Sequence, residues 1–304
     1  MTSIKTNNSA MAALQTLRNV NTNLNSTQKA VSTGLRISQA SDNATYWSVA
    51  TTMKSDVGAL GAVSDTLGLG AAKVDTAYTA MDSAIDIVGQ IKDKLVTAKE
   101  GSVDKTKVQA ELTQLQSQLQ SVAQSASFNG ENWVVAASGG DASVVSSFVR
   151  NASGGVSVSS ATYTFDTGAK GNVLFGSVSG KIDTTSGILG TKDSSAGNFS
   201  VSSLNIKGMT GGQIDSAMNM VETALSAMTS AAAQLGSLSS RIDLQTSFAS
   251  SLSDAITSGV GKLVDANMEQ ESSKLSALQT QQQLAIQSLS IANSSSQSIL
   301  SLFR

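Results

Sequence analysis

Residues 275–304 read LSALQTQQQLAIQSLSIANSSSQSILSLFR, and only the last of them, Arg304, carries a charge. Half of these thirty residues are Ser, Gln or Asn, while the apolar residues recur at helical spacing. A helix with one side in water normally carries Lys and Glu on that side. The stretch therefore predicts a helix whose polar side also meets protein.

The N-terminal segment has the same character, because no acidic residue precedes Asp42 and few basic residues do. Its apolar residues follow steps of three, four and seven, which predicts a helix over residues 2–33 with a coiled-coil seam. The seam comprises Ala10, Ala13, Leu17, Val20, Leu24 and Val31. Gly34 is expected to end this helix. We interpret both ends as helices that become buried against each other and against other copies of the chain.

Composition excludes several classes of function. The chain has 304 residues, no Pro, no Cys and no His, so disulfides and zinc sites built on thiolate or imidazole are excluded. A net charge of −2 gives no electrostatic footprint for nucleic acid, and no basic run suits a membrane surface. No catalytic constellation is present, so we expect neither an enzyme nor a cofactor. We also expect no cleaved signal peptide, since residues 1–20 lack an apolar core.

The middle of the chain is expected to hold more helices. One begins near Asn43 and continues to about Lys99, and after a turn at Gly101 another follows with Ser102 as its N-cap. The second carries a heptad pattern, which we interpret as core packing within the chain rather than as a contact between subunits. The heptad positions are Val108, Leu112, Leu115, Leu119, Val122 and Ala126. A last helical region begins at Gly212, with a junction loosened by Gly259 and Gly261.

Residues 134–210 differ in composition, because they contain 12 of the 25 glycines. Short alternating or β-branched runs between the glycines predict strands. The expected strands are Trp133–Ala136, Val144–Val149, Val156–Phe165, Val173–Phe175 and Phe199–Ile206. The predicted fold is therefore mainly α with a small β-rich insert, and the N- and C-terminal segments form a long antiparallel helical coiled-coil shaft.

Two long stretches carry a resemblance to a known family. KAVSTGLRISQASDNATYWSVA (29–50) resembles the N-terminal signature of bacterial flagellins, in particular the alphaproteobacterial, rhizobial type, and LVDANMEQESSKLSALQTQQQLAIQSLSIANSSSQSILSLFR (263–304) resembles their C-terminus. The Tyr46-Trp47 pair is a variation within the signature. The matching signature residues are Ser32, Thr33, Gly34, Arg36, Ile37 and Asp42.

The resemblance implies a structural subunit that polymerises non-covalently into the flagellar filament for swimming. Residues 1–42 and 256–304 would form the inner coiled-coil tube, residues 43–133 and 211–255 a helical rod, and residues 134–210 a variable outer surface. The polymerisation interface would comprise Ile4, Met11, Leu14, Leu17, Val20, Leu24, Val31, Leu275, Leu278, Leu284, Ile286, Leu289, Ile299, Leu302 and Phe303.

The implied partners are further copies of the chain or other flagellins, an export chaperone on residues 263–304, and the hook-junction and cap proteins. The implied location is the extracellular flagellum, reached by type III export. Both ends are rich in mediocre helix formers, so we expect them to order only when neighbouring subunits cover them. The alternatives are a hook–filament junction protein, or a secreted adhesin or immune ligand that binds through its β-rich insert.

Overall fold

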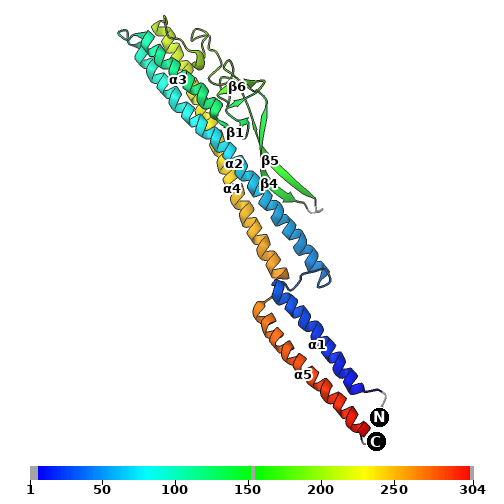
Figure 1. The fold of residues 1–304 in the computed structure, drawn as a ribbon. Coiled ribbons are helices and arrows are strands. Elements are labelled where there is room, and N and C mark those ends of the chain that lie inside the picture. The colour runs from blue at the N-terminus through cyan, green and yellow to red at the C-terminus, as the bar shows by residue number, and fades with distance from the viewer. Residues whose placement is uncertain (1–5, 152–154, 302–304) are drawn as a thin grey trace. The chain divides into compact units, whose positions relative to one another are not determined.

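The computed structural model describes residues 6–151 and 155–301, with the side chains of residues 295–301 excepted. It divides into two compact units. Unit 1 comprises residues 1–58 and 253–304, and unit 2 comprises residues 59–252. Helices α2 (Ala44–Lys99) and α4 (Gly211–Val264) contribute to both units. The prediction of a mainly α fold with a small β-rich insert is confirmed (Figure 1).

Unit 1 contains the terminal helices α1 (Asn8–Thr33) and α5 (Met268–Ser301), which lie side by side and antiparallel (Figure 1). The side-chain oxygen of Asn7 accepts a hydrogen bond from the N–H of Ala10 and so caps the start of α1. Gly34 ends the helix with φ +71°, as expected. The predicted start of this helix, residue 2, lies outside the described residues.

In unit 2, α3 (Lys105–Ser125) packs with α2 and α4 over one apolar core. The core side chains of the helices include Leu67, Met81, Ile91, Leu95, Leu112, Leu119 and Ile214. Most of the heptad positions on α3 are therefore buried within the chain, as the interpretation of core packing requires. The N-cap of α3 is Asp104, whose carboxylate accepts from the N–H of Thr106, so the prediction of Ser102 was wrong.

The β-rich insert consists of short, separate sheets. Strands β1 (Ser127–Phe128) and β2 (Glu131–Asn132) form one hairpin, and β4 (Asp141–Arg150) and β5 (Val156–Thr164) form a longer one. Strand β6 (Phe175–Val178) lies between β3 (Val135–Ala136), to which it is parallel, and β7 (Lys181–Asp183), to which it is antiparallel. Among the residues of the insert that the structure describes, the buried apolar side chains join the core of the helices rather than forming a separate one.

The β1–β2 hairpin was not predicted, although its turn is Asn129-Gly130, with φ of 51° and 83°. Asn-Gly is a strong hairpin signal because both residues adopt positive φ at low cost. Of the strand expected over Trp133–Ala136, only Val135–Ala136 forms a strand, which is β3.

The strand predicted over Phe199–Ile206 was wrong, because this segment holds the 3-10 turn η1 (Val201–Ser203). Its backbone is paired with side chains of α3 instead of with a strand. The side-chain amide of Gln116 donates to the carbonyls of Val201 and Leu204, and the side-chain oxygen of Gln109 accepts from the N–H of Ile206. Both glutamines are buried, so these bonds satisfy groups that water does not reach.

The expectation of a junction loosened at Gly259 and Gly261 was also wrong, because α4 runs unbroken to Val264. Packing outweighs the helix penalty of about 1 kcal/mol for each glycine. Val260 and Val264 on this last part of α4 are buried against Ile37 and Ala50. The helix is interrupted only after Val264, by the non-helical residues 265–267 that precede α5.

A matched pair of valines on α2 tests the core of unit 2. Val88 is fully buried and Val96 is 55% exposed. We expect Val88→Ala to lower the free energy of unfolding of this unit by about 2 kcal/mol, since the loss of two methyl groups leaves a cavity. Val96→Ala should change it by less than about 0.5 kcal/mol. Urea denaturation followed by circular dichroism measures both, and equal effects would contradict this assignment of the core.

Candidate assembly interface

The seam between α1 and α5 is short of buried apolar side chains. Val20 and Leu24 of α1 pack with Leu278 of α5, and these three form the whole buried cluster of the seam among the described residues. Two side-chain hydrogen bonds also join the two helical segments. The side-chain amide of Asn7 donates to the carbonyl of Ala292 over 2.8 Å, and the amide of Gln282 donates to the side-chain oxygen of Asn21 over 2.7 Å.

The seam also holds polar groups without hydrogen-bond partners. The hydroxyl of Thr27 is buried and, within the described part of the chain, makes no hydrogen bond. The carboxylate oxygen of Glu271 is buried as well, and it lies 3.7 Å from the ammonium nitrogen of Lys274, an ion-pair distance rather than a hydrogen bond. An unsatisfied buried polar group costs about 1–3 kcal/mol. Within a single chain, the contact between α1 and α5 is therefore only weakly stabilising.

The structure divides the predicted interface residues into three groups. Those in the seam of one chain are Val20, Leu24 and Leu278. Half-buried residues are Leu17, Val31, Leu275 and Leu289, whereas Met11, Leu14, Leu284 and Ile286 are exposed. The remaining positions lie outside the described residues or side chains: Ile4, Ile299, Leu302 and Phe303.

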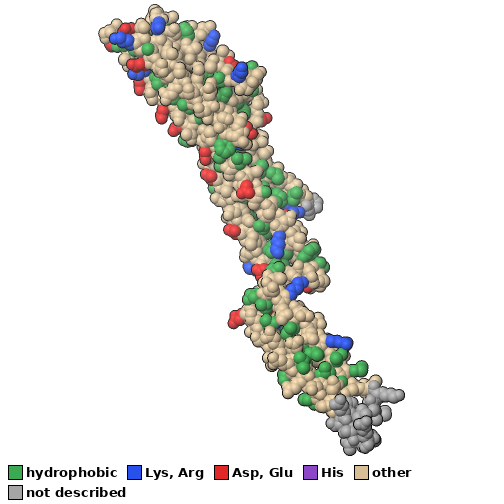
Figure 2. Space-filling view, viewed as in Figure 1, with side chains coloured by type: hydrophobic (Ala, Val, Ile, Leu, Met, Phe, Trp, Pro, Cys, Tyr) green, Lys and Arg blue, Asp and Glu red, His purple; other side chains and the backbone are tan. Residues whose placement is uncertain are grey.

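The exposed apolar residues of α1 and α5 lie on an almost uncharged surface. No charged residue occurs between Lys274 and Arg304, and α1 carries only Arg18 and Lys29. On the face drawn in Figure 2, the described part of α1 and α5 is mostly tan and green, with few charged side chains. Exposed apolar side chains among uncharged polar ones are typical of a surface that another protein covers.

Several residues of the family signature lie just after α1, where the chain is hydrogen-bonded to the end of α4. We call this contact, between residues 34–37 and residues 263–267, the junction. The carbonyl of Gly34 accepts from the N–H of Ala266, and the carbonyl of Val264 accepts from the N–H groups of Arg36 and Ile37. The guanidinium of Arg36 donates to the carbonyl of Leu263 over 2.9 Å. The exposed carbonyls at the end of α4 are thus satisfied by the segment that follows α1.

Ile37 anchors this junction, because its side chain is buried with those of Ala50, Val260 and Val264. Two other signature residues, Ser32 and Thr33, are exposed in the last turn of α1. The hydroxyl of Thr33 donates to the carbonyl of Lys29 and accepts from the N–H of Leu35. These two hydrogen bonds of Thr33 stabilise the C-terminal end of α1.

Asp42 fixes the loop between α1 and α2. Its carboxylate accepts hydrogen bonds from the N–H groups of Ser38 and Gln39 and from the hydroxyl of Ser38. The bond from the N–H of Ser38 is the main cause that lowers the pKa of Asp42 below its usual value. The signature therefore encodes a hydrogen-bonded junction, and it brings together Gly34, Arg36, Ile37 and Asp42.

Sequence reasoning missed the other half of the junction, residues 264–267. The signal was present, because Asn267 precedes a helical run and is followed three residues later by Gln270, the pattern of a helix N-cap. The side-chain oxygen of Asn267 accepts from the N–H groups of Glu269 and Gln270. It was also not predicted that Tyr46, Trp47 and Val49 would be exposed together at the start of α2.

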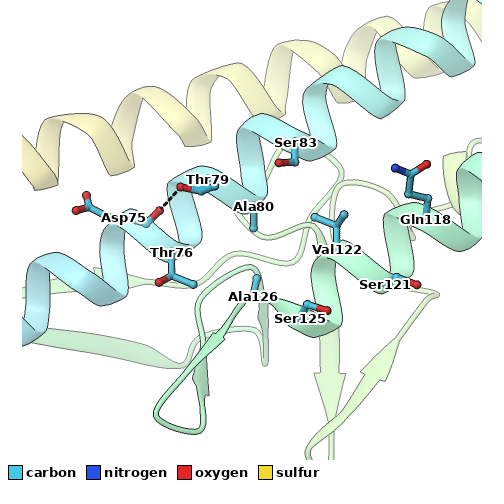
Figure 3. A pocket seen from close by; sticks show the side chains of 10 residues that line it. All are labelled: Asp75, Thr76, Thr79, Ala80, Ser83, Gln118, Ser121, Val122, Ser125 and Ala126. Carbon is cyan, nitrogen blue, oxygen red and sulfur yellow. Dashed lines mark hydrogen bonds between the residues drawn. The ribbon is translucent and has the colours of Figure 1, made fainter.

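Unit 2 offers a shallow groove of about 600 Å³ between α2 and α3 (Figure 3). Small and hydroxyl-bearing side chains line it, and Asp75 is its one charged residue. The carboxylate of Asp75 accepts from the hydroxyl of Ser239 on α4. Apart from Asp75, the side chains that line the groove are uncharged.

The described residues contain no group of three acidic side chains placed to hold a metal ion. Among the helices that the structure describes, none is both long and apolar enough to cross a membrane.

Comparisons with known proteins show what the chain is similar to. The sequence profile of the bacterial flagellin N-terminal helical region matches residues 4–138, and that of the C-terminal helical region matches residues 218–303. The chain is 45% identical to Flagellin A of Rhizobium meliloti, 48% identical to Flagellin C of its strain 1021, and 47% identical to a flagellin of Brucella melitensis. In each case the alignment covers 100% of both chains.

Two glycines in unit 1 test the junction, and at neither would an added Cβ have another atom within 4 Å. Gly34 adopts φ +71°, so Gly34→Ala should destabilise the assembled state by about 1–2 kcal/mol per subunit. Gly58 lies within α2, so Gly58→Ala should leave stability unchanged or raise it by up to about 1 kcal/mol. The measurement is the temperature at which polymers dissociate, followed by light scattering. Effects of the same sign would refute the role of the left-handed turn.

Proposed function

The chain belongs to the bacterial flagellin family, and we propose that α1 and α5 together form its main polymerisation interface. The protein is a structural subunit of the flagellar filament, which is external to the cell. The comparisons do not favour a hook–filament junction protein or an adhesin. Flagellins are structural proteins rather than enzymes.

The observation that carries this proposal is the exposed apolar surface of α1 and α5. Met11 and Leu14 on α1, and Leu284 and Ile286 on α5, are exposed although few charged residues surround them. The helices are 26 and 34 residues long, and their described residues bury few apolar side chains: the cluster of Val20, Leu24 and Leu278, and the small Ala285. Neighbouring copies would supply the missing burial, with the gain proportional to the apolar area removed from water.

The three-layer organisation belongs to the same proposal. Residues 1–42 and 256–304 would form the inner tube, residues 43–133 and 211–255 the rod, and residues 134–210 the outer surface. The distribution of charge supports the distinction between the inner tube and the rod. The ion pairs Lys92–Glu222, Lys94–Glu111 and Lys99–Asp215 lie at exposed positions of unit 2, where water solvates them.

The remaining partners rest on family membership. We propose that an export chaperone holds residues 263–304 before assembly, because this segment would otherwise present the exposed apolar residues of α5 to solvent. Export through the flagellar type III system without a cleaved signal peptide, and contacts with hook-junction and cap proteins, complete the proposal.

A charge placed on α5 tests the interface. Ile286 is 55% exposed, so Ile286→Lys should leave the free subunit folded but place an unpaired ammonium group in the polymer contact. We expect seeded polymerisation to fail in light scattering and in negative-stain microscopy.

The matched control is Val178→Lys on β6 in the insert, at a valine that is 63% exposed. It should polymerise like the unchanged protein, because the outer surface would stay in water. Normal filaments from Ile286→Lys would refute the proposed interface.

Trypsin distinguishes the free subunit from the filament. The weak seam predicts rapid cleavage after Arg18, Lys29 and Lys274 in the free subunit, because these helices open, and protection of all three sites in the filament. Lys92 and Lys99 serve as internal controls, since both lie in ion pairs of the well-packed unit 2 and should resist in both states. Mass spectrometry identifies the fragments. Resistance at Arg18 and Lys29 in the dilute free subunit would show that the terminal pair is stable alone.

A further inference from the structure

The sulfur chemistry of this chain rests on methionine, because the sequence has nine Met and no Cys. All of them except Met1 lie in the described part of the chain. Among these, Met11 on α1 is 63% exposed and Met268, the first residue of α5, is 43% exposed. The others are half-buried or buried: Met53, Met81, Met209, Met218, Met220 and Met228.

The exposure of methionine follows the division into two units. Met81 and Met228 are fully buried in the core of unit 2, and the other described methionines of that unit are buried or half-buried. In unit 1, Met53 is half-buried against the apolar cluster around Ile37, whereas Met11 and Met268 are exposed. An oxidant dissolved in water therefore reaches the sulfur atoms of the terminal helices first.

The two exposed methionines have different surroundings. Met11 and Leu14 are three residues apart on one face of α1, both are exposed, and the nearest charged residue within the helix is Arg18. Met268 instead precedes Glu269 and Glu271 in the first turn of α5. Met11 thus belongs to the uncharged surface proposed to meet other copies, and Met268 lies among carboxylates.

Oxidation of a thioether changes what such a surface can do. When the sulfur attacks hydrogen peroxide, an S–O bond forms, the O–O bond breaks, and the second oxygen leaves as water. The sulfur is oxidised and the peroxide is reduced. The product is a methionine sulfoxide, which is polar and accepts hydrogen bonds where the thioether was apolar. In a contact that excludes water, this oxygen would lose its hydration without gaining a partner.

We propose that Met11 is a modification site through which peroxide blocks assembly of the free subunit. The sulfoxide at Met11 disfavours the covered state, whereas the folded unit 2 is unaffected because its sulfur atoms are shielded. Assembly in turn covers Met11, so the polymer resists the oxidant that disables the free subunit. The proposal rests on the assignment of α1 and α5 as the polymerisation interface.

Peptide mapping by mass spectrometry tests the selectivity. Free subunits treated briefly with hydrogen peroxide should gain one oxygen atom at Met11 and Met268 well before Met81 and Met228, which serve as internal controls in the core of unit 2. In filaments treated in the same way, Met11 should stay unmodified. Equal oxidation of Met11 in filaments and in free subunits would overturn the proposal.

Two sulfur-free variants separate Met11 from the other exposed methionine. Met11→Leu and Met268→Leu nearly conserve side-chain volume, and each is compared with its own untreated polymerisation threshold, the lowest concentration that supports polymerisation. Peroxide should raise this threshold at least about tenfold for the unaltered protein and for Met268→Leu, and leave that of Met11→Leu unchanged. An equal rise for Met11→Leu and the unaltered protein, or no rise for either, would overturn the proposal.

Enzymatic reversal shows that the lesion is a sulfoxide. Methionine sulfoxide reductases A and B together reduce both epimers back to the thioether. Treated subunits should regain their original threshold after incubation with both enzymes. A threshold that stays raised although mass spectrometry shows Met11 reduced would overturn the proposal.

A polar variant tests the site without any oxidant. Met11→Gln places an uncharged polar group at the same exposed position, so it should raise the threshold while leaving the thermal unfolding of unit 2 unchanged. Assembly of Met11→Gln at the threshold of the unaltered protein would overturn the proposal. Polymerisation of the untreated protein tests the filament function by itself, and Ile286→Lys tests the interface, so the failures are distinguishable.

Discussion

The structure of unit 1 depends on one hydrogen-bonded junction, in which the backbone after α1 satisfies the carbonyl groups at the end of α4. Val264 and Leu263 would otherwise end their helix with unpaired acceptors, which are costly wherever water is excluded. Because Gly34 turns with positive φ, the next residues reach these carbonyls at once. Residues 34–37 therefore follow α1 and also pair with the end of α4, so that one contact holds the ends of both helices.

Unit 2 and the α1–α5 pair of unit 1 differ in how much apolar surface they bury. Unit 2 has a continuous core that includes fully buried Leu, Ile, Met and Phe side chains from helices and insert alike. The α1–α5 pair has a small seam with an unsatisfied hydroxyl at Thr27. Local stability follows buried apolar contact, so unit 2 holds its fold within one chain, whereas the terminal pair gains most from what covers it. In the proposed assembly, copies that bind the folded terminal pair would stabilise it by mass action.

The sequence was most informative where periodicity and packing agree. The heptads of α1 and α3 and the glycine after Thr33 predicted helices and an end that the structure confirms. Prediction failed where tertiary contacts replaced local preference. The run Phe199–Ile206 has the composition of a strand, but the buried amides of Gln109 and Gln116 bind its backbone. Likewise Gly259 and Gly261 lie within a helix, because the neighbouring Val260 and Val264 are buried against Ile37 and Ala50.

Sequence patterns predicted the candidate interface less completely, for a physical reason. A heptad identifies apolar side chains but does not tell which of them face the partner helix in the same chain. Val20 and Leu24 lie in that seam, whereas Met11 and Leu14, on the same helix, are exposed. The absence of charge is the more useful signal for a surface that meets other copies, since it concerns the polar positions that a heptad ignores. It marks α5, where no charged residue occurs between Lys274 and Arg304.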